Sequence, residues 1–368
     1  MSAPIRVRIG VFGTGAVAQA VHLPLLAKRA DLFEVVSLCD LSRATLDAVG
    51  VRYGVSSERR FGSLGELLAA RGIDAVMILS SGSHGAAAAA AARAGLPVFC
   101  EKPLAYTLAE TEELTEARLA LGYMKLYDPA VVRAREIVRK RSPARSIEVT
   151  VLHPSAASQL AHAGPLATAA DVPPETLARL RHESDALAER ALGMAARELG
   201  RLYTDVLLGS VVHDLAVVRD LVGDPVRIDH AETWGETSVV ILATLPGEAR
   251  LSIRWHYLEG YPAYREEVAV HDERGTVAVV FPSPYLLHAA TVLTVAEAED
   301  GAVRTTRFRS TAEAFERELA AFYELVTTGA PPASGVAEGR ADIVTCQAVV
   351  RRLAEQRGLE LGGEALRG

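Results

Sequence analysis

The chain has 368 residues, of which 49% are hydrophobic and 23% are charged, and its formal net charge is −7. This length predicts two domains, each large enough to bury a core. The acidic balance and an aromatic share of 5% argue against a surface that binds nucleic acid.

The cysteines and the apolar runs are typical of a cytoplasmic protein. Cys39, Cys100 and Cys346 lie far apart and form no C-x-x-C pair. Such a pattern fits packed free thiols in a reducing compartment and provides no metal cage. The apolar run near the N-terminus is too short for a signal peptide, and no run approaches the length of a membrane span. We therefore expect a cytoplasmic protein with no metal and no membrane partner.

The N-terminal segment carries a dinucleotide-binding pattern. Residues 5–12 predict a strand, residues 13–18 read Gly-Thr-Gly-Ala-Val-Ala, and residues 19–29 have a helical period. This is the G-x-G-x-x-[GA] fingerprint in its context of strand, tight turn and helix. A pyrophosphate would sit at the helix N-terminus, where free N–H groups and the dipole favour an anion. The predicted cofactor-binding residues of this loop are Gly13, Thr14, Gly15, Ala16 and Val17.

An acidic residue follows the second predicted strand, residues 34–39. Asp40 stands where a carboxylate can accept hydrogen bonds from the hydroxyls of the adenosine ribose. Its charge would repel a 2′-phosphate, so we predict NAD as the cofactor. NADP is the less favoured alternative, because Arg43 is close enough in sequence to hold that phosphate.

Alternating helices and strands continue and predict a parallel sheet with helices on both faces. The predicted elements are a helix over 64–71, a strand over 75–79, a turn over 80–84, an alanine-rich helix to residue 94, a strand over 96–100 and a helix over 108–120. His84 heads a helix, where a histidine is more often a capping or packing residue than a ligand.

Glu101-Lys102-Pro103 follows the strand 96–100, at the edge where open parallel sheets bind ligands. A partly desolvated lysine can lose its proton near neutral pH and act as an acid or a base. Taken alone, most Glu-Lys pairs are solvated surface charges. The assignment of Lys102 therefore depends on the rest of the chain.

The second half of the chain changes its period. The sequence predicts a strand over 121–127, a helix from Pro129 to 141 capped by Asp128, a strand over 146–152 and a helical stretch over 171–202. Period-two strands follow over 238–244, 249–257, 267–271, 276–281 and 291–296, and helices over 315–327 and 341–356. The expected fold is an α/β Rossmann domain over 1–122 and an α+β domain over 123–368 with an open, largely antiparallel sheet. Trp255, Tyr257 and Tyr264 on its open face would make the protein a homo-oligomer.

This organisation resembles the glucose–fructose oxidoreductase / inositol dehydrogenase (Gfo/Idh/MocA) family over essentially the whole chain. The shared residues are Gly13-x-Gly15-x-x-Ala18, the His84 turn, Ala94-Gly95-x-Pro97-Val98-x-x-Glu101-Lys102-Pro103, Gly122-Tyr123 through Tyr127-Asp128-Pro129, and His213 followed by Leu221-Val222-Gly223-Asp224-Pro225. The Glu-Lys-Pro run after the alanine–glycine helix end is highly characteristic of that family.

The resemblance implies an activity and a site. Family members mostly oxidise or reduce a carbinol carbon of a sugar, a sugar derivative or a cyclitol with a nicotinamide cofactor. It implies that Lys102 lies beside nicotinamide and substrate oxygen, with a cis Lys102–Pro103 bond. His213 matches the second catalytic residue, although alone it would pass for a core histidine. The residues implied to flank the cofactor are Ser80, Ser81, His84 and Glu101.

Two departures indicate a divergent subgroup. Many members carry Asp four residues before this histidine, where the chain has Gly209, and Asp214 or Asp205 could replace it. Many also have Asn after Gly-Tyr, where the chain has Met124-Lys125. Lys125 is then a substrate ligand or a second cation that lowers the pKa of Lys102. The candidate substrate ligands are Lys125, Tyr127, Asp128, His153, Tyr203 and Asp214.

The predicted reaction is hydride transfer between nicotinamide and a substrate carbon that bears a secondary hydroxyl or a ketone. Lys102 would move the proton and His213 would assist. One alternative is a lyase or glycosidase that oxidises its substrate transiently with no net redox change. The other is a non-catalytic NAD sensor, against which the retention of Lys102 and His213 argues, because a sensor does not need a proton shuttle.

Overall fold

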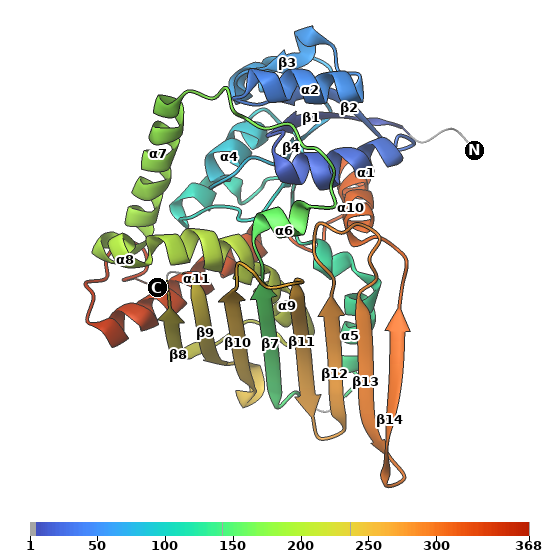
Figure 1. The fold of residues 1–368 in the computed structure, drawn as a ribbon, viewed down its shortest axis with the longest axis vertical. Helices are drawn as coiled ribbons and strands as arrows, with labels where there is room; N and C mark the ends of the chain where they lie inside the picture. The colour runs from blue at the N-terminus through green and yellow to red at the C-terminus, as the bar shows by residue number, and fades with distance from the viewer. Residues whose placement is uncertain (1–4, 142, 236, 368) are drawn as a thin grey trace. The chain divides into compact units, whose positions relative to one another are not determined.

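The computed structural model describes residues 5–141, 143–235 and 237–367, and the chain divides into two compact units (Figure 1). The first unit contains the stretch up to Tyr123 together with Ala163–Leu187 and Phe315–Arg340. The second unit contains Met124–His162, Ala188–Ala314 and the stretch from Ala341.

The first unit is built on a parallel sheet, as predicted. Among the described residues its order is β3-β2-β1-β4-β5-β6. The neighbouring positions of β1 and β4 make the point where strand order reverses, which is where such sheets bind ligands. Every residue of β4 and β5 is buried, because helices cover both faces. The strands are β1 Val7–Phe12, β2 Phe33–Cys39, β3 Arg60–Phe61, β4 Ala75–Ile78, β5 Val98–Cys100 and β6 Leu119–Leu121.

The helices of this unit follow the predicted alternation with one correction and one addition, because α2 was not predicted. The helix predicted over 108–120 is wrong: the structure has a short 3₁₀ helix, η3 Ala109–Leu114, and then β6. Leu119–Leu121 are buried and pair with β5, so sheet pairing overrides the local helical preference. The other helices are η1 Ala18–His22, α1 Leu23–Lys28, α2 Arg43–Tyr53, η2 Ser57–Arg59, α3 Leu64–Ala69, α4 Gly85–Arg93, most of α7 Pro174–Leu192, and α10 Ala314–Thr328.

The second unit carries the open sheet, and the predicted fold class is confirmed. Figure 1 shows its strands side by side in the order β14-β13-β12-β11-β7-β10-β9-β8. All described pairs are antiparallel except β7 with β10. The two edge strands of this sheet, β8 and β14, were not predicted. The strands are β7 Ser146–His153, β8 Arg227–Trp234, β9 Ser238–Thr244, β10 Arg250–Tyr257, β11 Arg265–Asp272, β12 Gly275–Phe281, β13 Val292–Glu299 and β14 Ala302–Arg309.

Helices of the second unit cover one face of this sheet, with α5 packed on β12 and α9 on β11. The strand predicted over 121–127 is wrong, because β6 ends at Leu121 and Met124–Tyr127 form the 3₁₀ helix η4. The remaining helices are α5 Pro129–Val138, α6 Ala156–Leu160, η5 Gly193–Ala195, α8 Ala196–Arg201, η6 Leu202–Val211, α9 Val212–Val222, η7 Pro246–Glu248 and most of α11 Val336–Arg357.

Of the three aromatic residues expected on the open face, Tyr257 is 38% exposed, whereas Trp255 and Tyr264 need a correction. Trp255 is 4% exposed, and its indole N–H donates to the Ser210 hydroxyl on η6, so it faces the helices. Tyr264 donates to the buried Glu266 on the same side. The large apolar side chains that β8 and β9 expose are instead Trp234 and Leu242. The homo-oligomer stays a prediction.

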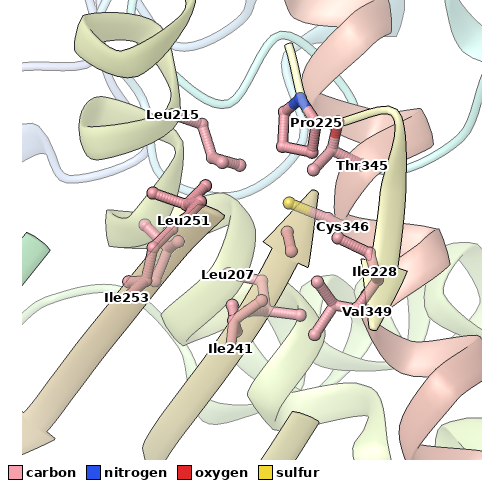
Figure 2. Close-up of a pocket in the computed structure, with 12 residues that line it drawn as sticks. Leu207, Leu215, Pro225, Ile228, Ile241, Leu251, Ile253, Thr345, Cys346 and Val349 are labelled. Carbon is pink, nitrogen blue, oxygen red and sulfur yellow. The ribbon is translucent and has the colours of Figure 1, made fainter. Parts of the chain in front are cut away.

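A small apolar cavity lies between α9, α11 and the strands of the second unit (Figure 2). Aliphatic side chains such as Leu207, Ile241 and Ile253 line it. A polyhydroxylated substrate needs hydrogen-bonding groups around it. This cavity is therefore a packing space of the core and not the substrate site.

Candidate active site

The glycine-rich loop after β1 has the shape that a pyrophosphate needs. Gly13 has φ +94°, and a Cβ there would lie 2.4 Å from the backbone nitrogen of Ser80, so only glycine fits. A Cβ on Gly15 would meet no atom within 4 Å, so the space beside it is open. The buried Thr14 lies between them. The loop thus leaves its backbone accessible in front of the first helix, which begins at Ala16.

Asp40 ties this loop to the start of α2. Its Oδ2 accepts hydrogen bonds from the Thr14 N–H (2.7 Å) and the Thr14 hydroxyl (2.9 Å), and its Oδ1 accepts from the Ser42 N–H (2.9 Å). The carboxylate thereby stands beside the glycine-rich loop at the end of β2. This is the position from which an acidic residue can contact an adenosine ribose.

Glu101 anchors the segment that carries Lys102. Its Oε1 lies 2.8 Å from Nε2 of the buried His22, and its Oε2 accepts the backbone N–H of Lys102 at 3.2 Å. Burial works to raise the pKa of Glu101, but the hydrogen bond from His22 and the charges of His22, Lys102 and His84 outweigh it and lower that pKa. An ionised Glu101 therefore fixes the backbone from which Lys102 projects.

Two buried residues that interact electrostatically with Glu101 were not predicted. His22 lies one helical turn beyond the glycine-rich loop, and Glu318 comes from α10, far along the chain. Burial and the nearby charge of Glu101 raise the pKa of Glu318 well above its ordinary value. Position after the fingerprint could have drawn attention to His22, whereas nothing local distinguishes Glu318 from an exposed helical glutamate.

Lys102 is half-buried, and its bond to Pro103 is cis, as predicted. The carbonyl of Pro103 is 2.7 Å from His84 Nδ1, and the carbonyl of Ser80 is 2.7 Å from His84 Nε2. His84 thus joins the turn after β4 to the segment after β5, which is a positioning role. Ser81 is exposed in the same turn.

His213 and Asp214 open α9 in the second unit. His213 is half-buried, whereas Asp214 is buried and faces Glu266 on β11. Burial raises the pKa of Asp214 well above its ordinary value, and the charge of Glu266 adds to that shift. Glu266 was not among the predicted site residues, although a glutamate within an apolar strand is a recognisable signal of a buried pair.

Glu266 is the centre of a buried polar cluster formed by Lys125, Asp214, Tyr264 and Glu266. Lys125 forms an ion pair with Glu266, and its Nζ lies 5.0 Å from the centre of the Phe281 ring. The Tyr264 hydroxyl donates to Glu266 Oε2 at 2.5 Å. Burial, followed by the charge of Glu266, raises the pKa of Tyr264 well above its ordinary value, so the phenol keeps its proton.

The other candidate substrate ligands are more dispersed within the second unit. Asp128 uses both oxygens structurally, accepting the Ala130 N–H (2.7 Å) and the Thr291 hydroxyl (2.5 Å). Tyr203 is fully buried in η6, and Tyr127 is half-buried in η4. His153 lies against the rings of Trp255 and Tyr264, with centroids 5.2 and 5.8 Å away. Of the predicted set, the structure brings Lys125 and Asp214 together.

The described residues hold neither a metal-binding cluster nor a membrane-spanning helix. No group of three or more histidine, cysteine, aspartate or glutamate side chains is arranged to hold a metal ion within 5–141, 143–235 and 237–367. Over the same ranges, none of the helices has the length and hydropathy to cross a membrane.

Residues 7–123 match the family model described as the oxidoreductase family with an NAD-binding Rossmann fold. This match and the similarity to inositol 2-dehydrogenases support the Gfo/Idh/MocA family for the chain. Inositol 2-dehydrogenase/D-chiro-inositol 3-dehydrogenase of Shouchella clausii is 31% identical over 155 residues, which are 40% of this chain and 44% of that protein. Inositol 2-dehydrogenase of Rhizobium meliloti is 24% identical, covering 96% of this chain and 99% of that protein.

The solved structures give the same architecture for this chain. Aldose-aldose oxidoreductase from Caulobacter crescentus, complexed with glycerol, superposes with a TM-score of 0.72 at 19% identity, covering 96% of this chain and 99% of that one. At that identity the likeness shows the fold alone. The chain spans less than half the length of the curated relatives that it matches first.

The departure at Gly209 from the Gfo/Idh/MocA pattern lies on the π-helix η6. A Cβ at Gly209 would stand 3.1 Å from the Thr204 carbonyl oxygen, so a side chain there would be crowded. Asp205 is exposed on the same helix, whereas Asp214 is buried in the cluster around Glu266. Of the two carboxylates considered as replacements, Asp214 has the surroundings of a site residue.

Proposed function

We propose that this protein is a nicotinamide-dependent oxidoreductase that acts on a secondary alcohol or ketone carbon of a sugar, a sugar derivative or a cyclitol. The observation that carries the proposal is the Glu101-Lys102-cis-Pro103 segment at the carboxyl end of β5, held by His22 through Glu101. The inositol dehydrogenase names of the relatives support the substrate class.

The residues of the first unit fit a dinucleotide. Of the predicted loop residues, Gly13 and Thr14 would shape the turn, because their N–H groups donate to Cys39 and Asp40. The backbone N–H groups of Gly15, Ala16 and Val17 would hold the pyrophosphate, and Asp40 would accept from the adenosine ribose. Ser80, Ser81, His84 and Glu101 would position the nicotinamide half. When bound, the nicotinamide supplies or accepts the hydride.

The side chains of Lys102 and His213 would carry out the proton transfer. Lys102 would take the proton from the substrate hydroxyl during oxidation and return it during reduction, and as a cation it would stabilise a developing alkoxide. His213 would share that proton. In the second unit, the Lys125 ammonium would donate to a substrate hydroxyl, and the Tyr264 oxygen, whose proton goes to Glu266, would accept from one. Asp214 and Glu266 would hold both groups in place.

The test removes the amine of Lys102 and keeps the cofactor site. Lys102→Ala should bind NADH with nearly wild-type affinity, measured by isothermal titration calorimetry. Its turnover on a panel of cyclitols, sugars and nucleotide-sugars should fall by about 10²–10⁴-fold, because a positioned acid/base contributes that much. Lys140→Ala, at an exposed position, is the control. Near wild-type turnover in Lys102→Ala would refute the assignment.

A transient-oxidation lyase or glycosidase is the second candidate. The observation that favours it is the attachment of residues 167–171 to the loops beside the glycine-rich turn, which would slow cofactor release. In that case product would form from the panel without accumulation of NADH. A steady rise of NADH absorbance with substrate excludes it.

A further inference from the structure

The segment that joins α6 to α7 (green in Figure 1) is attached to the cofactor loops of the first unit. Its first attachment is at the buried Gln19. The Ala167 N–H donates to Gln19 Oε1 at 2.8 Å, and Gln19 Nε2 donates to the carbonyls of Ala167 (3.0 Å) and Thr14 (2.8 Å). The segment is therefore fixed to the glycine-rich loop itself.

The second attachment places a carboxylate at the N-terminus of α2. Asp171 Oδ1 accepts from the Ser42 hydroxyl at 2.5 Å, and Oδ2 accepts from the Ala44 N–H at 2.9 Å. Ser42 is the N-cap of this helix, where the dipole favours an anion. These hydrogen bonds lower the pKa of Asp171, so the group is ionised at neutral pH.

The 2′-phosphate of NADP would have to bind at the start of α2, at residues 42–44. Asp40 precedes Ser42 by two positions and stands where the adenosine ribose is held, so a phosphate on that ribose needs donors or cations nearby. The Ser42 hydroxyl and the Ala44 N–H are already bonded to Asp171, and the Ser42 N–H to Asp40. Arg43, the residue that could have favoured NADP, has its Nε 3.3 Å from Asp47 Oδ2.

We propose that Asp171 is a cofactor-specificity residue: it occupies the donors at the start of α2 and excludes the 2′-phosphate of NADP. The inference rests on the proposed dinucleotide function. Asp40 and Asp171 together present two negative charges to that phosphate, and the Arg43–Asp47 pair is exposed and weak. The contacts of Gln19 with Ala167 hold the segment so that Asp171 keeps its place.

The test compares the affinities of NADH and NADPH by isothermal titration calorimetry, with no substrate needed. The wild-type protein should bind NADH at least about tenfold more tightly than NADPH, because like charges a few ångströms apart repel strongly. Asp171→Asn and Asp171→Ala should shrink that ratio about fivefold or more, mainly by tightening NADPH. Asp185→Asn, which removes an exposed charge from α7, the helix that follows this segment, should leave the ratio unchanged.

The outcomes separate this inference from the proposed function. A wild-type protein that binds NADH, with both Asp171 variants folded and their ratios within twofold of wild type, overturns the role of Asp171 alone. Tighter binding of NADPH than NADH by the wild type overturns it as well. A wild-type protein that binds neither nucleotide overturns the proposed function, and the specificity role with it. Thermal melts of the variants establish that they are folded.

Discussion

At the scale of single residues, two buried carboxyl groups, those of Asp214 and Glu266, lie beside one lysine, Lys125. Lys125 neutralises Glu266, and Asp214 faces the same glutamate in a place that water does not reach. A second buried negative charge would lack a counterion, and such a charge is costly. Burial and the charge of Glu266 therefore raise the pKa of Asp214 well above the ordinary value. Asp214 keeps its proton and avoids that cost.

The raised pKa of Asp214 predicts how stability depends on pH. Between the ordinary pKa and the raised one, the native state holds a proton that the unfolded state releases, so the free energy of unfolding falls as pH rises. Asn cannot ionise, so Asp214→Asn removes this loss. Urea unfolding from about pH 4 to about pH 8 should show the variant gaining stability relative to wild type as pH rises.

Asp185→Asn provides the control for that series, because Asp185 is exposed on α7. Its stability should run parallel to that of wild type across the pH range. Parallel curves for Asp214→Asn and wild type would show that Asp214 is ionised in the native state, against this account.

At the scale of elements, the predicted substrate ligand Asp128 is also the N-cap of helix α5. The sequence predicted Asp128 both as the N-cap and as a substrate ligand. The structure gives it the cap bond to Ala130 and a second bond from the buried Thr291. Both carboxylate oxygens hold the start of α5 to the segment before β13, so this residue's first role is structural.

Asp128→Ala should therefore lower the free energy of unfolding by about 2 kcal/mol, from the lost cap and the unpaired Thr291 hydroxyl. Asp128→Asn should cost clearly less, because its amide oxygen can still accept from Ala130 and its NH₂ can donate to Thr291. Urea denaturation at neutral pH measures both. An Ala variant as stable as the Asn variant would contradict the capping role.

The elements also show where sequence reasoning is sufficient and where it is not. The fingerprint around Gly13 and the cap at Asp128 depend on neighbours along the chain, so both were predicted. β6 depends on pairing with β5, and the edge strand β14 is exposed at all eight positions, so no buried period marks it. Glu266 and Glu318 acquire their roles from Lys125 and Glu101, each more than a hundred residues away. Local patterns carry no such information.

At the scale of the whole molecule, the chain passes between its two units five times, after residues 123, 162, 187, 314 and 340. The first unit therefore lacks part of its structure unless 163–187 and 315–340 return to it. Within that unit, Glu318 and the Asp171 attachment both come from these returning stretches. We expect this interleaving to make the two units unfold together.

Both tryptophans of the chain, Trp234 and Trp255, belong to the second unit, whereas the proposed cofactor site belongs to the first. NADH at about 100 times its Kd should add about 2.7 kcal/mol to the folded state. If the units unfold together, the thermal midpoint followed by tryptophan fluorescence should rise as much as the calorimetric midpoint. Gly15→Ala adds a Cβ that meets no protein atom within 4 Å but occupies the space beside the loop, so the variant should fold normally and lose both shifts. A calorimetric shift with an unmoved tryptophan midpoint would show instead that the units unfold separately.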